Sequence, residues 1–367
     1  MASRRQLLTR LLQTTALMAA APGLLASDFS SYMQRQQQGV KDMQLSWQSY
    51  RQRYQQAWQA YRTRLARVWT DPLLPSQKVW VEYSDDLRTR RELDFARNEV
   101  RLSFAAGDDA QLTDQRIRAE FERVMQQALT EAARQDGVMR AAEPQQTLSS
   151  DLPLAGGKAD WKQVAADRTR SATTTPRGEV ITITIPLASA LPDRSQQYLP
   201  LVQRYARKWQ TEPALVLAIM ETESAFNPMA RSHIPAFGLM QIVPASAGRD
   251  ASQHAYGRER LLSGTELCTP EVNIELGCAY LNLLDKRYLR AVTDPTSRLF
   301  CVIAAYNTGA GNVARAFSGN TSVADAASKI NRMTSKQVYA HLRGHLKYEE
   351  ARNYLYKVTK ALQSYRG

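Results

Sequence analysis

Residues 215–228 constrain the fold more than any other stretch, because they place a carboxylate among apolar side chains near a helix end. Apolar residues recur there at spacings of three and four, which predicts a helix with one mostly apolar face. Glu223 lies four residues after Ile219 and three before Phe226, so it shares that face, whereas Glu221 points away from it. The stretch therefore predicts a buried glutamate.

The flanking residues define where this helix begins and ends. Pro213 suits a first helical turn, with Thr211 as a candidate N-cap, and Asn227-Pro228 ends the helix. Burying a carboxylate is costly, and it raises the pKa toward the value that a general acid needs at neutral pH. The alternative is a structural glutamate bound by a backbone amide or an arginine, and this helix alone favours that alternative.

Three later motifs reverse this preference. They are Gly-Leu-Met-Gln-Ile at 238–242, Asn273-Ile274 with Gly277 and Tyr280-Leu281, and Ala-Ala-Tyr-Asn-Thr-Gly-Ala-Gly at 304–311. With Glu223-Ser224, and in this order, they resemble the catalytic domain of the soluble-lytic-transglycosylase-like, goose-lysozyme-related superfamily. The tail at 351–366 is similar to the membrane-bound lytic murein transglycosylase C branch. The resemblance is close from about residue 195 to the end and loose over 70–190.

This resemblance implies a peptidoglycan lytic transglycosylase that needs no cofactor. Such an enzyme cleaves the β-1,4 bond between N-acetylmuramic acid and N-acetylglucosamine and leaves a 1,6-anhydro end. Glu223 matches the family's acid and base. The residues that the resemblance places at the substrate, with Met240 as an apolar wall, are Ser232, Met240, Gln241, Tyr306, Asn307 and Tyr354. Ser232 could equally be an ordinary loop serine, and Tyr354 could equally belong to the core.

The number of carboxylates separates this function from its alternatives. Most glycosidases use two, and no second acidic residue lies within the motifs. A goose-type lysozyme, which hydrolyses the same bond with water, would need a second carboxylate. A non-catalytic glycan-binding module would be expected to lose Glu223 or the Tyr306-Asn307 pair, and this chain has both.

The first 26 residues predict an export signal. Arg4, Arg5 and Arg10 give a basic start, and residues 11–25 are moderately apolar but too short and interrupted for a transmembrane span. Residues 3–8 partly match a twin-arginine signal, and the alternative is an ordinary secretory signal that happens to carry two arginines. We favour the twin-arginine signal, because Gln13, Thr14 and Thr15 interrupt the apolar region. The branch named above is usually anchored through a cysteine just after the signal, whereas the first cysteine here is Cys268. We therefore expect an exported, periplasmic protein without a lipid anchor.

The net charge of +13 favours polyanionic partners. No nucleic-acid-binding motif is recognisable, so we expect wall glycan strands as the partner, with electrostatic contact to an anionic wall or membrane surface. The three cysteines, Cys268, Cys278 and Cys301, could form a disulfide or stay as buried thiols. No spacing of histidines and cysteines suggests a metal site.

The chain divides into an α+β region followed by an all-α, lysozyme-like domain. We expect an accessory domain over 27–192 and the catalytic domain over 193–367, with a linker at 186–192. Within 71–192 the patterns predict one helix at 112–134, a loose stretch at 136–177, and strands at 78–83, 91–95, 99–104 and 180–185. From 196 onward the predicted helices are 199–209, 213–226, 241–248, 272–288, 297–306, 312–317, 322–333 and 349–365.

Residues 34–70 predict a basic helix with an aromatic stripe. Its apolar residues follow spacings of three and four, and most of its arginines lie off the stripe. Such a helix could lie on anionic lipid or glycan. We favour the alternative, in which the stripe packs on its own domain or on a partner helix and the arginines are solvated. The stripe consists of Trp47, Tyr50, Tyr54, Trp58, Tyr61, Leu65 and Trp69.

Overall fold

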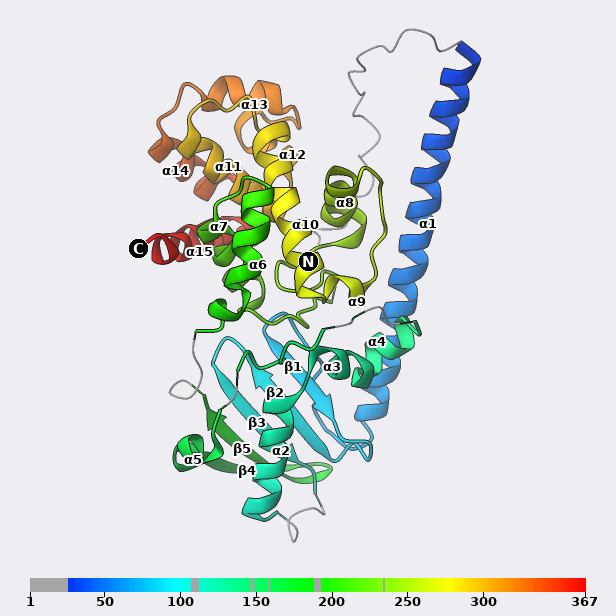
Figure 1. The fold of residues 1–367 in the computed structure, drawn as a ribbon, viewed down its shortest axis with the longest axis vertical. Helices are drawn as coiled ribbons and strands as arrows, with labels where there is room; N and C mark the ends of the chain where they lie inside the picture. Colours follow the sequence, from blue (N-terminus) through cyan, green and yellow to red (C-terminus); the bar gives the residue numbers. More distant parts are fainter. Residues whose placement is uncertain are drawn as a thin grey trace.

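The structure is a computed structural model that describes residues 26–106, 112–145, 148, 150–157, 159–187, 193–233 and 235–367. The predicted export signal and positions 188–192 of the predicted linker therefore lie outside the described residues. Figure 1 shows a sheet at the base with helices above it, and the long helix α1 running along one side.

The N-terminal part is built on one antiparallel sheet in the order β1-β2-β3-β5-β4. The four predicted strands are confirmed, and a fifth, β4, lies in the stretch expected to be loose. On one face, Val100, Leu102 and Phe104 of β3 are fully buried and pair with Ile185, Ile183 and Ile181 of β5. The strands are β1 (Val79–Tyr83), β2 (Thr89–Asp94), β3 (Glu99–Phe104), β4 (Thr169–Thr175) and β5 (Gly178–Pro186).

Short helices complete this part. The helix expected at 112–134 is two helices, α2 (Asp114–Gln126) and α3 (Leu129–Gln135), because Gln127 and Ala128 are extended and Ala128 bridges to Pro153. Ile117, Phe121 and Val124 of α2 are buried in the core of this part. Two further helices lie in the stretch expected to be loose, namely α4 (Gly137–Ala142) and α5 (Trp161–Val164).

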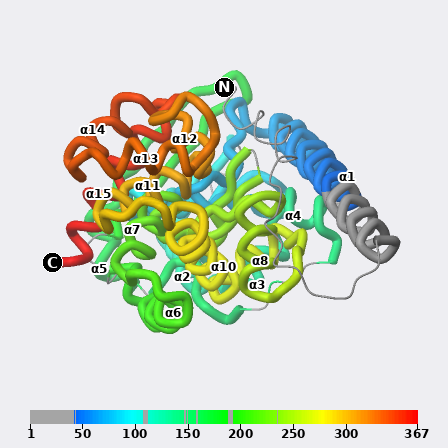
Figure 2. The backbone as a smooth tube through the Cα atoms, turned by 90° about the horizontal axis from the view of Figure 1, so that it is seen from above, coloured from blue at the N-terminus to red at the C-terminus, as the bar shows by residue number. Residues whose placement is uncertain are grey.

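Helix α1 (Ala26–Leu65) packs its aromatic stripe against the protein, as the favoured interpretation predicted. Trp47, Tyr50 and Tyr54 are buried, and the last two meet Phe237 of the helical part edge to face, with ring centroids 6.4 and 5.8 Å apart. The helix ends at Leu65 rather than at 70. Figure 2 shows α1 on the opposite side of the molecule from α14 and α15.

From residue 193 onward the described chain is helical, which confirms the predicted order of an α+β region and an all-α region. A helix at 335–345 was not predicted, and the helix expected at 241–248 begins only at Pro244 as a π-helical turn (Pro244–Gly248). The α-helices are α6 (Ser195–Lys208), α7 (Pro213–Ser224), α8 (Arg249–Tyr256), α9 (Gly264–Leu267), α10 (Pro270–Leu283), α11 (Pro295–Thr308), α12 (Ala310–Ser318), α13 (Val323–Ile330), α14 (Ser335–His345) and α15 (Glu349–Arg366).

Buried polar contacts join the two parts. Arg231 of the helical part pairs with Asp136 at 2.7 Å, with both side chains almost inaccessible. Glu143 accepts hydrogen bonds from the backbone N–H groups of Gly264 and Thr265, at 2.6 and 2.9 Å, and from the Tyr50 hydroxyl at 2.6 Å. The hydrophobic core also runs without a break from α1 into α15. The two parts are therefore packed as one unit, and the domain boundary at 192/193 remains a proposal.

Among the described residues, no helix has the length and apolar character that crossing a membrane requires.

Candidate active site

Helix α7 is buried on almost every side, which differs from the one-faced helix that the spacing predicts. Six consecutive residues are buried, Leu215, Val216, Leu217, Ala218, Ile219 and Met220, while Glu221 is exposed. Pro213 lies in the first turn as expected. The N-cap is Glu212 rather than Thr211, and no side chain caps the helix. Helix α7 is thus a central, buried helix of the domain rather than a surface helix.

The predicted acid, Glu223, lies at the C-terminal end of helix α7. Glu223 has an exposed fraction of 8%. The helix stops at Ser224, because Ala225 and Phe226 adopt left-handed backbone conformations with φ of 51° and 65°. Two such residues in succession store strain, which is common beside functional sites. Phe226 therefore lies beyond the helix rather than on its face.

Ser224 ties the end of α7 to the following loop. Its hydroxyl lies 2.9 Å from the carbonyl oxygen of Met220 and 2.8 Å from that of Leu239, and it can donate to either. This arrangement orders the end of the helix. It also places the loop at 238–242 against the residue that follows Glu223.

Asn273 of α10 fixes the same loop. Its amide donates to the carbonyl oxygens of Phe237 and Leu267, at 2.9 and 2.6 Å, and its side-chain oxygen accepts from the Met240 N–H at 2.8 Å. Gly238 has a φ of 74°, and a Cβ there would lie 2.1 Å from the Leu267 carbonyl oxygen. These two motif residues therefore shape the backbone rather than perform chemistry.

Tyr306 links the third motif to this loop. Its hydroxyl donates a hydrogen bond of 2.8 Å to the carbonyl oxygen of Met240, and its ring meets Tyr280 edge to face at 5.6 Å. Burial, and then the charge of Glu223, raise the pKa of Tyr306 well above its usual value. The phenol therefore stays protonated near Glu223. Asn307, the next residue, is half-buried.

Gln241 provides an unused acceptor. Its backbone is left-handed, with a φ of 49°, and its side chain is 7% exposed. The side-chain nitrogen donates to the Gly238 carbonyl oxygen at 3.1 Å, whereas the side-chain oxygen is buried without a partner in the described part of the chain. Leaving such a group unpaired costs about 1–3 kcal/mol.

The remaining predicted substrate residues are less open than expected. The Met240 side chain is fully buried beneath Gly277, so it does not form an exposed apolar wall, and only its carbonyl group meets Tyr306. The Ser232 hydroxyl accepts from the Ala236 N–H at 3.2 Å within its own loop. Tyr354 is buried, with an exposed fraction of 6%, on α15, which packs along α7.

Lys78 is a neighbour that no motif indicates. It is half-buried at the start of β1, and its charge interacts with those of Glu221, Glu223 and Lys357. Burial first, and then Lys357, lower its pKa. The adjacent Gln77 carbonyl oxygen accepts from the Asn227 side chain at 3.2 Å. The sheet therefore reaches the end of α7, which sequence patterns cannot reveal because the contact depends on tertiary packing.

The cysteines are buried free thiols. Burial raises the pKa of Cys278 and of Cys301 to about 12, so both remain protonated. Cys268 is also buried, and burial raises its pKa further. The described residues contain no cluster of three or more side chains able to hold a metal ion.

Comparison with known proteins assigns the family. Residues 200–329 match the family described as "Transglycosylase SLT domain". The membrane-bound lytic murein transglycosylase C of Histophilus somni (strain 2336) is 35% identical over 310 residues, covering 80% of this chain and 82% of that protein. The Klebsiella pneumoniae (strain MGH 78578) protein of the same name is 36% identical over 308 residues, covering 80% and 83%. The chain therefore belongs to the lytic murein transglycosylase family of enzymes.

A solved structure is also similar. The 70 kDa soluble lytic transglycosylase of Escherichia coli matches with 25% identity and a TM-score of 0.36, covering 46% of this chain and 24% of that one.

Proposed function

We propose that this enzyme is a peptidoglycan lytic transglycosylase in which Glu223 is the single acid and base. One observation carries the proposal. Of the six buried acidic residues in the described chain, only Glu223 belongs to the helical part. The other five lie in the N-terminal part, and each has structural partners there or in the neighbouring loops; they are Glu82, Glu92, Asp94, Asp136 and Glu143.

A single carboxylate suits a reaction in which the substrate supplies its own nucleophile. Glu223 protonates the 4-oxygen of the leaving sugar while the N-acetyl group of the muramic acid residue assists its departure. The resulting carboxylate then takes the proton of the 6-hydroxyl, which closes on C1 and leaves a 1,6-anhydro end. A buried carboxyl group, which is harder to ionise, suits the first step.

The neighbouring groups have positioning roles in this proposal. Gln241, whose side-chain nitrogen donates to the Gly238 carbonyl oxygen, is proposed to contact the acetamido group of the sugar. Tyr306, held by the Met240 carbonyl group, keeps the loop at a fixed distance from Glu223. Asn307, Ser232 and Tyr354 are proposed to contact more distant parts of the strand.

Two alternatives remain distinguishable. A goose-type lysozyme would need a carboxylate poised to activate water, and no second buried acid lies in the described helical part. A non-catalytic glycan-binding module would not release muropeptides at all. A lysozyme would make hydrolytic products from the same substrate and a glycan-binding module would make none, so product analysis separates both alternatives from a transglycosylase.

The test is the pair Glu223→Gln and Glu221→Gln on purified wall sacculi. Glu223→Gln should abolish muropeptide release and leave the melting temperature nearly unchanged. Glu221 is exposed on the same helix, so Glu221→Gln is the matched control and should retain activity. Turnover by Glu223→Gln at the parent rate would refute the assignment.

We also propose that residues 27–192 act as an accessory domain to the catalytic domain at 193–367, and that the protein works in the periplasm. The basic charge of the chain and its predicted export signal support this location. Cell fractionation that recovers the protein only with the cytoplasm would contradict it.

A further inference from the structure

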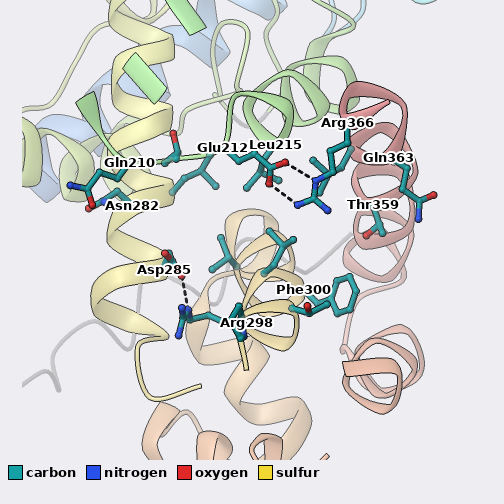
Figure 3. A pocket seen from close by; sticks show the side chains of 17 residues that line it. Gln210, Glu212, Leu215, Asn282, Asp285, Arg298, Phe300, Thr359, Gln363 and Arg366 are labelled. Carbon is teal, nitrogen blue, oxygen red and sulfur yellow. Dashed lines mark hydrogen bonds and ion pairs between the residues drawn. The ribbon is translucent and has the colours of Figure 1, made fainter. Parts of the chain in front are cut away.

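A cavity of about 460 Å³ lies at the end of α7 opposite Glu223 (Figure 3). Leu215, in its lining, is eight residues before Glu223, a rise of about 12 Å along the helix. Helix α11 has the same polarity, since Tyr306 lies near its C-terminal end while Phe300 lines the cavity. The cavity is therefore separate from the candidate active site. Its volume falls within the range of about 300–1,000 Å³ that is usual for ligand sites.

The charged groups in the lining are already paired with one another. Glu212 accepts two hydrogen bonds from Arg366, both at 2.6 Å, and Asp285 accepts one from Arg298 at 2.7 Å. Figure 3 shows these two pairs on opposite sides of the cavity. The described lining contains no other ionisable side chain. It therefore offers no unpaired charge to an anion or a cation, and an uncharged ligand fits it best.

The groups that remain suit a sugar. Gln210 and Gln363 are exposed at the rim, and no hydrogen bond within the described chain holds either side-chain amide. Phe300 is only half-buried, with its ring against Tyr339 at a centroid distance of 5.0 Å. An aromatic ring can cover the C–H face of a pyranose, while neutral amides bind hydroxyl and acetamido groups.

We propose that this cavity is a second, non-catalytic site that binds one uncharged N-acetylated sugar unit of a wall glycan strand. The choice of a glycan rests on the proposed function. A strand held here would stay near the enzyme between cuts, which raises the effective concentration of the next bond at the active site.

Methyl NMR of the full chain carrying Glu223→Gln tests whether the cavity binds a sugar, because each methyl signal reports on its own surroundings. The probe is the uncharged β-1,4-linked tetramer of N-acetylglucosamine. Leucine methyl groups of Leu215, Leu281 and Leu362 report on the cavity. The methyl group of Met240 points into the core, but its carbonyl oxygen accepts from Tyr306, so the methyl signal reports indirectly on the loop beside Glu223. We expect both sets of signals to move, with separate binding curves.

Variants then assign the cavity signals. Gln363→Ala and, separately, Phe300→Ala should weaken the binding seen at the leucine methyls by roughly tenfold, equivalent to about 1.4 kcal/mol, and leave the Met240 curve unchanged. Gln203→Ala, an exposed glutamine on α6, is the matched control and should change neither curve. Gln363 is exposed, so its variant should fold even if Phe300→Ala does not.

Two outcomes would overturn the proposal. Leucine methyls that stay fixed while Met240 responds would mean that the cavity binds no sugar. Leucine methyls that respond to a stem peptide but not to the tetramer would make it a peptide site. If the proposed function is wrong, wall digested by the parent enzyme will contain no anhydro muropeptides. The leucine signals would still show whether the cavity binds the sugar.

Discussion

Arg231 and Asp136 form a buried ion pair at 2.7 Å between the helical part and the N-terminal part. The backbone N–H of Arg231 also donates to the Ser76 carbonyl oxygen at 3.3 Å. Arg231 belongs to the loop that follows α7, so the N-terminal part holds the loop that carries Ser232. The accessory region is therefore expected to stabilise the catalytic one rather than fold as an independent appendage.

The first prediction follows from this pair. Asp136→Ala leaves the Arg231 charge buried without its partner, so it should lower the free energy of unfolding by about 3–5 kcal/mol. Asp114→Ala breaks the exposed pair with Arg168 and should cost less than about 1 kcal/mol. Urea unfolding of both variants measures the difference. Equal effects would show that the buried pair does not join the two parts.

The second prediction concerns Tyr306. Tyr306→Phe removes the hydrogen bond to the Met240 carbonyl group and keeps the ring. Misplacing the loop by about 1 Å could lower the rate of muropeptide release by roughly 100-fold, while stability changes by only about 1 kcal/mol. Tyr356→Phe is the control, because Tyr356 is 50% exposed. A Tyr306→Phe enzyme with full activity would exclude this positioning role.

The third prediction is a loss of stability at alkaline pH caused by two thiols. The pKa of Cys278 and of Cys301 is raised from 9.0 to about 12 in the folded state. Above pH 9 the unfolded chain loses these protons while the folded chain keeps them. Each thiol should therefore lower the free energy of unfolding by about 1.4 kcal/mol per pH unit until pH about 12. Replacing both with alanine should remove their share of this dependence and leave that of Cys268, whose pKa burial also raises. An unchanged slope would contradict the prediction.

The fourth prediction tests whether α1 and the turn after it bind wall by charge. Deleting residues 27–70 would remove buried Trp47 and Tyr54 from the core, so surface substitutions are the better test. Replacing three exposed arginines with serine should weaken binding to sacculi, and the difference should vanish near 1 M salt, where the Debye length is about 3 Å. The three are Arg53, Arg62 and Arg67. The control is a variant with the same change in charge elsewhere on the surface, in which Arg258, Arg290 and Arg332 are replaced with serine. Equal weakening by both sets would assign the binding to net charge alone.

Sequence patterns predicted the elements whose periodicity is strong. The apolar alternation of β3 and β5 located two central strands, and the spacing of the aromatic residues in α1 predicted its packing. Strand β4 was missed because six of its seven residues are exposed and it lies at the sheet edge, which leaves no apolar pattern to read. Helix α7 was predicted with one apolar face because spacing alone cannot show that other elements surround it.

The site was predictable where a motif carries it. Glu223, Tyr306 and the loop at 238–242 meet as the resemblance implied, although Met240 turns its side chain into the core. Lys78 and the Arg231–Asp136 pair could not be predicted, since each joins residues far apart in the chain with no shared pattern. The cavity at the start of α7 could not be predicted either, because its other walls come from α10, α11 and α15, which meet α7 only in the fold.

In the proposed mechanism the substrate's own 6-hydroxyl, and not water, attacks C1. A well-placed intramolecular nucleophile can reach an effective molarity of about 10⁵ M or more, far above the concentration of bulk water. Digestion of purified sacculi in heavy-oxygen water, followed by mass spectrometry of the muropeptides, measures the outcome directly. We expect the parent enzyme to give anhydro ends without solvent oxygen and Glu223→Gln to give no product. Products carrying heavy oxygen at C1 of most new muramic acid ends would show that the enzyme is a hydrolase.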